Sequence, residues 1–296
     1  MDRYVLLEER GLVTVAGEDR SAFLQGLISN DIAKVSPGRA VYAAFLTAQG
    51  KFLHDFFVID MGEMLALDCE RARADDLKKR LSLYKLRSKV VLANVSEEYR
   101  VFAAFGPTVV EKLELTEPGQ AKEYAGGIAY LDPRLKEMGA RVLLHSGFGE
   151  DPLIALGCVR AEPEAYHAER IANGLPDGSR DLPVEKAILL ENGFDEHRGI
   201  DWDKGCYVGQ ELTARTKYRG LVRKRLMPVE VEGPLPAFGT EIAFDGKEAG
   251  EMRSGQGDRA LAMLRLEVVE KALAEGQKLT AGEAKLTPIK PGWASF

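Results

Sequence analysis

The order of apolar and polar positions predicts alternating helices and strands in the first half of the chain. Residues 39–47 carry an apolar side chain at every second position, which is typical of a half-buried strand. Residues 52–59 are mostly apolar and rich in aromatic and branched side chains, so we expect a strand buried on both faces. Residues 20–29 repeat their apolar side chains at helical spacing. The same patterns predict strands at residues 12–16, 65–69, 90–95 and 100–105, and helices at 71–84 and from Pro183 onward.

The pattern changes beyond Gly220, where short apolar runs follow one another closely. We expect strands at residues 224–231, 240–244, 247–252, 260–266 and 284–289. Asp245-Gly246 is a strong signal for a tight hairpin turn. Short strands at such close spacing predict a small antiparallel β-barrel. The expected domains are therefore an N-terminal α+β lobe at residues 1–105, a second α/β lobe at 106–220 and the barrel at 221–296.

Composition narrows the classes of partner and compartment. The chain has 296 residues, a net charge of −6 and an ordinary hydrophobic content of 45%, so nothing in the overall charge attracts nucleic acid or an anionic membrane. Its cysteines are Cys69, Cys158 and Cys206, too far apart for a metal-binding CxxC pair and odd in number. We expect no secretory signal, no membrane span and a reducing, cytoplasmic location.

One segment, residues 203–220, concentrates the candidate chemistry. Cys206 stands between Gly205 and Gly209, two residues after Lys204 and close to the start of a predicted helix. A helix N-terminus and a nearby ammonium both favour the thiolate form of a cysteine. A free cysteine is also commonly a small, inert core residue. Chemistry alone leaves these two interpretations of Cys206 open.

A second candidate is the pair His54-Asp55, which interrupts the apolar strand at residues 52–59. A titratable group inside such a strand is costly unless it is satisfied by a partner. Asp55 is either a buried carboxylate that accepts hydrogen bonds or a carboxylate that lines a cavity with a shifted pKa. We favour the second interpretation of Asp55, a carboxylate that lines a cavity.

Residues 204–211, Lys-Gly-Cys-Tyr-Val-Gly-Gln-Glu, resemble the signature octapeptide of the YgfZ family. These are tetrahydrofolate-binding proteins linked to iron–sulfur cluster assembly and repair, with mitochondrial members, built on the fold of the glycine-cleavage aminomethyltransferase, the T-protein. Residues 29–31 and 169–176 resemble further elements of these proteins. The resemblance implies an α+β, T-protein-like, multi-lobed fold with a C-terminal barrel and a central folate channel.

The resemblance also assigns expected roles to single residues. It aligns Tyr42 with a folate-contacting tyrosine and Asp55 with the catalytic aspartate of the T-protein. Arg141 falls where the T-protein has a folate-binding glutamate, and Tyr166 falls at an arginine near folate. Both replacements put the detailed pterin geometry in question. The residues expected to bind or position the folate are Tyr42, Asp55, Arg141, Tyr166, Lys204, Gln210 and Arg219.

Arg219 belongs to a group of six cations between residues 215 and 225. The simplest interpretation is a solvated loop and strand edge. Because folate carries a glutamate tail, Arg219 and Arg223 could also bind its carboxylates. A nucleic-acid patch is disfavoured, since Tyr218 is the one aromatic residue among these cations.

Three functional hypotheses follow. The first is a tetrahydrofolate-binding accessory protein whose Cys206 loop supports iron–sulfur cluster assembly or repair, with assembly or client proteins as partners. The second is a tetrahydrofolate-dependent aminomethyltransferase-like enzyme in which Asp55 stabilises charge or relays a proton. The third is a folate-independent redox or acyl-transfer enzyme that depends on Cys206. A single cysteine cannot hold a zinc ion or a cluster by itself, so we predict no metal site unless a partner shares it.

Overall fold

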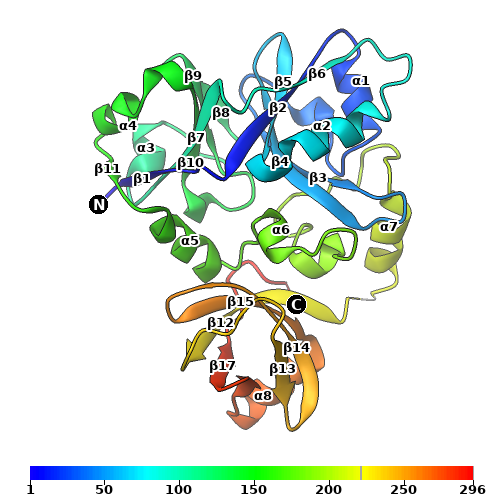
Figure 1. Cartoon of the computed structure of the whole chain (residues 1–296), viewed down its shortest axis with the longest axis vertical. Helices are drawn as coiled ribbons and strands as arrows, with labels where there is room; N and C mark the ends of the chain where they lie inside the picture. The colour runs from blue at the N-terminus through cyan, green and yellow to red at the C-terminus, as the bar shows by residue number, and fades with distance from the viewer. Residues whose placement is uncertain (221, 296) are drawn as a thin grey trace. The chain divides into compact units, whose positions relative to one another are not determined.

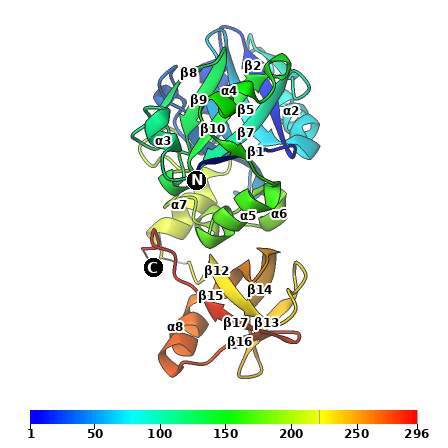
Figure 2. The same ribbon diagram turned by 90° about the vertical axis from the view of Figure 1, so that its left-hand side faces the viewer.

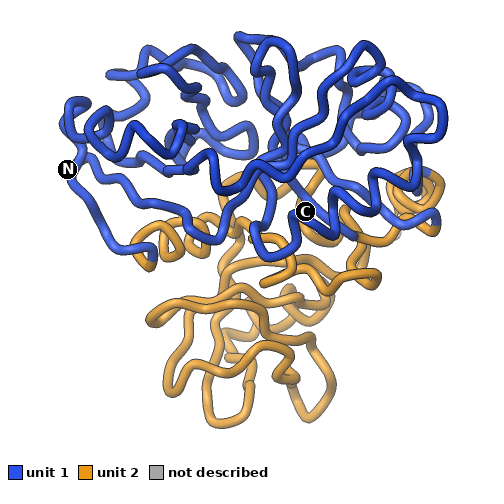
Figure 3. The backbone as a smooth tube through the Cα atoms, turned by 45° about the horizontal axis from the view of Figure 1, so that its top comes forward, with its two compact units in different colours: residues 1–48, 53–163, 197–210 blue, residues 49–52, 164–196, 211–296 orange. Residues whose placement is uncertain are grey.

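The computed structural model describes residues 1–220 and 222–295. Two compact units are distinguished (Figure 3): unit 1 comprises Met1–Ala48, Leu53–Pro163 and His197–Gln210, and unit 2 comprises Gln49–Phe52, Glu164–Glu196 and Glu211–Phe296. The division into three lobes at residues 1–105, 106–220 and 221–296 stays a prediction. Leu221 and Phe296, the outer bounds of the predicted barrel domain, lie outside the described residues.

Unit 1 contains a five-stranded sheet in the order β3-β4-β5-β2-β6 (Figure 1). Its strands are β2 (Arg10–Ala16), β3 (Val41–Leu46), β4 (Phe52–Asp60), β5 (Met64–Glu70) and β6 (Val91–Asn94). All residues of β4 up to its last are buried, which confirms the strand predicted from its apolar run. α2 (Ala74–Ser82) lies against β2 and β6, and its Leu77 and Leu81 point inward as its period predicts.

The helix predicted at residues 20–29 is shorter than its apolar pattern suggests. α1 spans Arg20–Gln25, and Ile28 instead forms a bridge with Phe45 of β3. The backbone N–H of Ser29 likewise donates to Ala44 O at 2.9 Å. Residues 28 and 29 therefore join the edge of the sheet because β3 offers them backbone partners.

A six-stranded sheet in the order β11-β1-β7-β10-β9-β8 forms the rest of the framework of unit 1. Its strands are β1 (Arg3–Leu6), β7 (Tyr99–Phe105), β8 (Ala121–Tyr124), β9 (Gly127–Leu131), β10 (Ala140–His145) and β11 (Val159–Arg160). The β1–β11 pair is parallel and the other pairs are antiparallel. Short helices α3 (Val109–Lys112) and α4 (Asp151–Ala155) pack Val109 and Leu153 into the core on this sheet.

Unit 2 contains a closed six-stranded barrel in the order β12-β15-β14-β13-β16-β17, with β17 pairing back to β12. Its strands are β12 (Lys224–Glu232), β13 (Glu241–Phe244), β14 (Lys247–Gln256), β15 (Arg259–Arg265), β16 (Leu279–Ala281) and β17 (Ala284–Pro288). The predicted barrel is confirmed. Asp245 and Gly246 both have positive φ, at 50° and 72°, as the predicted hairpin turn requires.

The sequence pattern missed two elements of the barrel. Figure 2 shows α8 (Leu266–Glu275) alongside the barrel strands, and its Val269 and Ala272 belong to the barrel core. The short strand β16 follows it and completes the closure. Both lie in the stretch between the last two predicted strands, where we expected no helix or strand. The three residues of β16 are too few to show an alternation of apolar and polar side chains.

The remaining helices of the chain are α5 (Pro163–Ala172), α6 (Gly178–Asp181) and α7 (Gln210–Tyr218), with 3-10 turns at Ile32–Lys34, Arg71–Arg73, Lys136–Met138, Ser146–Phe148 and Leu189–Asn192. The helix predicted from Pro183 is wrong. Glu185 has a φ of 60°, and its N–H donates to Phe52 O at 2.8 Å. Because Ala187 O accepts from Phe52 N, the backbone of this segment pairs with a distant residue instead of forming helical bonds.

Among the described residues, no helix has the length and hydrophobicity needed to cross a membrane.

Candidate functional site

Tyr42 and Asp55 form a buried pair on the five-stranded sheet. They lie on the neighbouring strands β3 and β4, and the Tyr42 hydroxyl donates to Asp55 Oδ2 at 2.8 Å. Both side chains are at least 95% buried. Burial and the charge of Asp55 raise the pKa of Tyr42 well above its usual value, so the phenol remains a hydrogen-bond donor. The sequence prediction that these two residues belong to one site is consistent with this contact.

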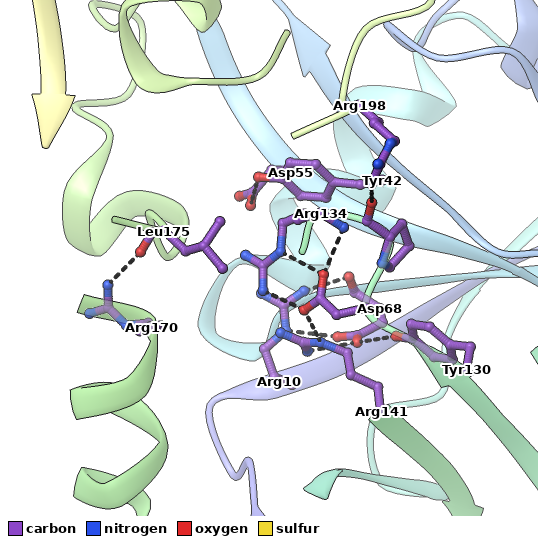
Figure 4. A network of polar contacts seen from close by, with 12 residues as sticks. Arg10, Tyr42, Asp55, Asp68, Tyr130, Arg134, Arg141, Arg170, Leu175 and Arg198 are labelled. Atoms are coloured by element: carbon purple, nitrogen blue, oxygen red, sulfur yellow. Dashed lines mark hydrogen bonds and ion pairs between the residues drawn. The ribbon is translucent and has the colours of Figure 1, made fainter. Parts of the chain in front are cut away.

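A layer of charged side chains lies between the two sheets of unit 1 (Figure 4). At its centre is Asp68 of β5, whose side chain is completely buried. Its carboxylate accepts from Arg10 Nε at 2.7 Å, from the Tyr130 hydroxyl at 2.9 Å and from Arg141 Nη1 at 3.0 Å. Tyr130 and Arg141 are cross-strand partners on β9 and β10. Asp68 therefore connects the five-stranded sheet to the six-stranded sheet through charge-assisted hydrogen bonds.

A second ion pair in this layer joins Arg134 to Asp132. Arg134 donates Nε and Nη2 to the two carboxylate oxygens of Asp132, at 3.0 and 2.8 Å, a bidentate arrangement. Burial opposes ionisation of Asp132, but the guanidiniums of Arg134 and Arg141 keep its pKa below the usual value. The layer thus contains three arginines and three aspartates, if Asp55 is counted, so its formal charges cancel.

The ring of Phe57 is the apolar centre around which these cations gather. The guanidinium carbon of Arg141 lies 4.2 Å from the ring centroid, that of Arg134 4.9 Å and that of Arg10 5.9 Å. The Tyr42 ring lies 5.2 Å from the same centroid. A cation over an aromatic face is attracted electrostatically by the ring. Phe57 therefore links the Tyr42–Asp55 pair to the Asp68 ion pairs.

The segment before Cys206 is attached to this layer through residues 29–31. Asn30 Nδ2 donates to Tyr42 O at 2.6 Å and to Arg198 O at 2.7 Å. Ser29 Oγ donates to Gly199 O at 2.5 Å. Residues 29–31, which resemble an element of the T-protein, thus hold β3 and residues 198–199 together.

Lys204 anchors the signature loop onto the end of α1. Its ammonium donates to the carbonyl oxygens of Gln25, Ile28 and Asn30 at 2.8, 2.7 and 2.8 Å. The ammonium also lies 5.1 Å from the centroid of the buried Tyr207 ring. Burial lowers the pKa of Lys204 to about 8, against the attraction of Asp31 and Asp201. All three N–H donors of the Lys204 ammonium bind backbone carbonyls, as expected of a side chain that shapes the loop.

Cys206 is exposed, whereas Cys69 and Cys158 are buried. The loop around it is fixed on both sides: Lys204 precedes it, and the Val208 N–H donates to Gly26 O at 3.1 Å. Gly209 has a φ of 82°, a conformation that favours glycine, while Gly205 has no positive φ and open space where a Cβ would lie. α7 begins four residues after Cys206, which confirms that the cysteine lies close to a helix start. The structure therefore presents an accessible thiol on an anchored loop, not a core cysteine.

Three further predicted site residues lie on or next to α5 and α7. Tyr166 is buried in α5 of unit 2, beside His167. Gln210 is the half-buried first residue of α7, and Arg219 is exposed directly after that helix. The roles of Tyr166, Gln210 and Arg219 in folate binding stay predictions.

Four of the six cations between residues 215 and 225 pair with carboxylates: Arg215 with Glu211, Lys217 with Asp195, Lys224 with Glu248 and Arg225 with Glu196. Among the described residues, Arg219 and Arg223 are exposed and form no such pair. They are the two cations that we singled out for a glutamate tail.

Arg170 lies in the stretch 169–176 that resembles a family element, and its side chain joins elements of unit 2. Its guanidinium pairs with Asp181 at 2.8 Å and donates to Leu175 O at 3.1 Å and Ser254 Oγ at 2.8 Å. Asp181 in turn accepts from the backbone N–H of Ser254 at 2.9 Å. This buried network ties α5, α6 and β14 together within unit 2.

Sequence reasoning missed Asp68, the centre of the charged layer. Asp68 interrupts the apolar run of β5 in the way that Asp55 interrupts β4. The same signal, a carboxylate inside a buried strand, could have found it. Its partners Arg10 and Tyr130 come from strands far away in sequence, so no local pattern connects them with it.

The residues present fit a folate ligand in part. A pterin ring presents N–H donors, and Asp55 is a buried acceptor, held in place by Tyr42. Arg141 cannot replace the acceptor function of a glutamate, because a guanidinium has donors only and this one is already bound to Asp68. A direct contact between Arg141 and folate stays a prediction, and such a contact would compete with that ion pair.

The chain has the glycine-cleavage T-protein-like fold. Residues 7–131 match the GCVT N-terminal domain family, and residues 223–296 match the CAF17 C-terminal beta-barrel domain. The crystal structure of the glycine cleavage system aminomethyltransferase T from Bartonella henselae superimposes with a TM-score of 0.78, covering 99% of this chain and 86% of that one. Its sequence identity is 14%, so this similarity concerns the fold.

The chain belongs to the family of the iron–sulfur cluster assembly factor IBA57. The mitochondrial IBA57 of Mus musculus is 35% identical, over 97% of this chain and 84% of its own length. The mitochondrial IBA57 of Homo sapiens is 36% identical, over 89% of this chain and 78% of its own length. The narrower assignment to the YgfZ group is not confirmed and stays a prediction.

The expected cytoplasmic location is wrong by the same comparison. The relatives from Mus musculus, Homo sapiens and Neurospora crassa are mitochondrial proteins. The expectation had rested on the small number of cysteines and on the lack of an evident secretory signal. Neither feature distinguishes the cytoplasm from another reducing compartment.

Proposed function

We propose that this protein is a tetrahydrofolate-binding accessory factor that supports iron–sulfur cluster assembly or repair through Cys206. The observation that carries the proposal is the exposed thiol on a loop anchored by Lys204, in a chain of the IBA57 family. An accessible cysteine at a fixed position can contact a partner protein or a cluster that the partner carries. A single thiolate supplies one ligand, so assembly partners or client proteins provide the others.

The folate part of the proposal rests on the Tyr42–Asp55 pair. Asp55 offers a buried acceptor whose orientation is set by the Tyr42 hydroxyl. Arg219 and Arg223 are exposed cations that could bind the carboxylates of the glutamate tail. On this proposal Asp55→Asn weakens or misorients tetrahydrofolate, and charge reversal at Arg219 and Arg223 changes the preference for polyglutamate forms.

A tetrahydrofolate-dependent aminomethyltransferase is the second candidate, because the resemblance aligns Asp55, which accepts a hydrogen bond from Tyr42, with the catalytic aspartate of the T-protein. The two candidates differ in one measurable step. An accessory factor binds tetrahydrofolate without transferring a one-carbon group, whereas the enzyme transfers an aminomethyl group from a lipoylated carrier protein.

The experiment combines calorimetric titration of the purified full chain with tetrahydrofolate and an aminomethyl-transfer assay. Binding without transfer supports the accessory role, and binding with transfer supports the enzyme. If no heat of binding is found at millimolar tetrahydrofolate, the folate part is wrong and a folate-independent thiol chemistry becomes the better hypothesis.

The role of Cys206 is tested separately in cells that lack the protein. We expect Cys206→Ser to fold and to bind tetrahydrofolate as the parent does, yet to fail to restore the activity of cluster-containing enzymes. Alkylation of the native protein provides the matched control, because iodoacetamide should modify Cys206 and leave the buried Cys69 and Cys158 intact. Full restoration by the serine variant would contradict a role for the thiol.

A further inference from the structure

Unit 1 contains a cavity that shares no lining residue with the Tyr42–Asp55 pair or the Cys206 loop. Its volume is about 570 Å³, within the range of small-ligand sites. It lies where the turn after β4 meets strands β8, β9 and β10. Its principal lining residues are Asp60, Tyr99, Glu123, Ile128, His145 and Phe148.

The formal charges that line this cavity are negative. Asp60 and Glu123 contribute carboxylates, and its described lining residues include no lysine or arginine. Glu123 is exposed and has no ion-pair partner in the part of the chain that the structure describes. Its neighbour Lys122 pairs with Glu114 at 2.7 Å. Asp60 Oδ1 accepts from the Gly62 N–H at 2.8 Å, which fixes the orientation of that carboxylate.

Arg20 reaches the turn after β4, where it is engaged with backbone carbonyls. Arg20 Nη2 donates to Gly62 O at 3.1 Å, and Arg20 Nη1 donates to Gly17 O at 3.2 Å. Among the described residues, Asp60 and Glu123 therefore line the cavity with no arginine or lysine beside them in its walls.

Aromatic rings form part of the wall. Tyr99 packs edge-to-face on His145, with ring centroids 5.5 Å apart and an interplanar angle of 75°. The Phe148 ring lies on the β8–β9 turn, where a Cβ added to Gly126 would approach Phe148 Cζ to 3.0 Å. Phe148 is nevertheless 51% exposed. Aromatic faces beside carboxylates attract organic cations.

The geometry disfavours a metal ion as the occupant. Among the described residues, no three metal-ligating atoms of the cavity's lining lie within 4.8 Å of one another. Asp60, Glu123 and His145 are therefore too widely spread to coordinate one ion together. An alkylammonium or guanidinium group, which spans several ångströms and contacts aromatic faces, fits this distribution better.

The strand that carries Glu123 points to a polypeptide as the source of that cation. β8 is the last strand of the six-stranded sheet, and β9 is its one strand partner among the described residues. The start of its outer edge is already covered by this chain, because the Ala121 N–H donates to Gly38 O at 2.9 Å and Arg39 forms a bridge with Gln120. Because N–H and C=O groups alternate between the two edges of a strand, those of Glu123 lie on the same outer edge as those of Ala121, beyond the covered part. An extended segment of a partner can pair with the edge at Glu123.

We propose that this cavity binds the lysine or arginine side chain of a partner polypeptide that pairs with the edge of β8 at Glu123. Glu123 and Asp60 bind the cationic group, and Tyr99 and Phe148 contact its aliphatic stem. The inference is independent of the proposed function, since none of its residues belongs to the Asp55 or Cys206 regions.

The test uses the ¹⁵N-labelled full chain and amide chemical-shift titration. The probes are a blocked pentapeptide with a central lysine flanked by serine and threonine, the same peptide with norleucine in place of lysine, and n-butylamine. We expect the lysine peptide to shift amides of β8 and of the turn after β4, and to bind at least about fivefold more tightly than the norleucine peptide. Equal binding of the two peptides would overturn the charge argument.

Variants separate the contributing side chains. Glu123→Gln and Asp60→Asn, which keeps the acceptor for Gly62, should each weaken the lysine peptide about threefold to tenfold, and Phe148→Leu should weaken it about threefold. Glu137→Gln, an exposed carboxylate of unit 1 outside the cavity, is the matched control and should change nothing. The proposal is overturned if Glu123→Gln binds as the parent does. It is also overturned, as a polypeptide site, if n-butylamine binds as tightly as the lysine peptide.

Discussion

The layer between the two sheets of unit 1 and the core of the barrel in unit 2 contain side chains of different kinds. The barrel core consists of apolar side chains such as Met252, Leu264 and Leu286. The layer between the sheets of unit 1 instead contains fully buried ion pairs centred on Asp68. Apolar packing stabilises without requiring precise partners, whereas buried charges are tolerated only when every partner is in place. The barrel therefore serves as a framework. In the charged layer, burial of the ion pairs carries a desolvation penalty, which a functional role of these residues would explain.

The largest expected effect comes from removing the centre of the charged layer. Asp68→Asn leaves Arg10 and Arg141 buried without their shared carboxylate, so the free energy of unfolding should fall by about 3–5 kcal/mol. Urea denaturation followed by the fluorescence of Trp202 in unit 1 and of Trp293 in unit 2, each in a single-tryptophan background, should place the loss in unit 1. An unchanged midpoint at Trp202 would show that the layer contributes little. Glu137→Gln serves as the surface control.

Lowering the pH should have the next largest effect, because it should destabilise unit 1 more than the barrel. Burial and Arg73 lower the pKa of His54, on β4, to about 4, below the value of about 6.5 in an unfolded chain. The unfolded state therefore binds more protons between these values, and the stability that neutral His54 provides is present above pH 6.5 and lost as pH falls toward 4. We expect unit 1 to lose about 3 kcal/mol at pH 4 from this group.

The comparison that checks this is parent against His54→Gln, which can still donate to Asp76 as His54 Nε2 does at 3.0 Å. The variant should lose much less stability between pH 7 and pH 4 at the Trp202 probe. Residues 224–288 of the barrel contain no histidine, so the Trp293 probe should not report this component. Parallel pH profiles for parent and variant would refute the assignment.

A smaller effect is expected where the signature loop meets α1. Lys204→Met removes three hydrogen bonds from backbone carbonyls at a buried position, and we expect a loss of about 2 kcal/mol. Faster alkylation of Cys206 by iodoacetamide would report that the loop has loosened. Lys89→Met is the control, because Lys89 and its partner Glu18 are both exposed, and its loss should cost less than about 1 kcal/mol. Equal losses in the two variants would argue against the anchor.

The smallest effects distinguish the two glycines of the loop. Gly209→Ala places a Cβ on a residue with a φ of 82° and should cost about 1–2 kcal/mol. Gly205→Ala has no such conformation and meets nothing within 4 Å, so thermal denaturation should show a change within about 0.5 kcal/mol. If both substitutions were equally harmful, the demand on Gly205 would come from a ligand or partner.

The candidate site was predictable where a polar residue breaks a local pattern. Asp55 inside the apolar run of β4 and Cys206 between close glycines both stood out from their neighbours, and Tyr42 followed from the alignment of one hairpin. Arg10 and Tyr130 had no such signal, because a charged or phenolic residue at a strand position is unremarkable until its distant partner is known. Lys204 was singled out by its motif, yet its contacts with residues 25–30 could not be read from a sequence separation of more than 170 residues.

The sequence by itself determined the elements that depend on local periodicity and turn chemistry: β4, α2 and the barrel hairpin at Asp245-Gly246. Only the tertiary structure decided that residues 183–187 form a turn, since Phe52 supplies the backbone partners that a helix would otherwise provide. It also decided that Arg141 and Tyr130 meet Asp68. The physical reason is that side-chain periodicity records which face of an element is buried, but not which element buries it.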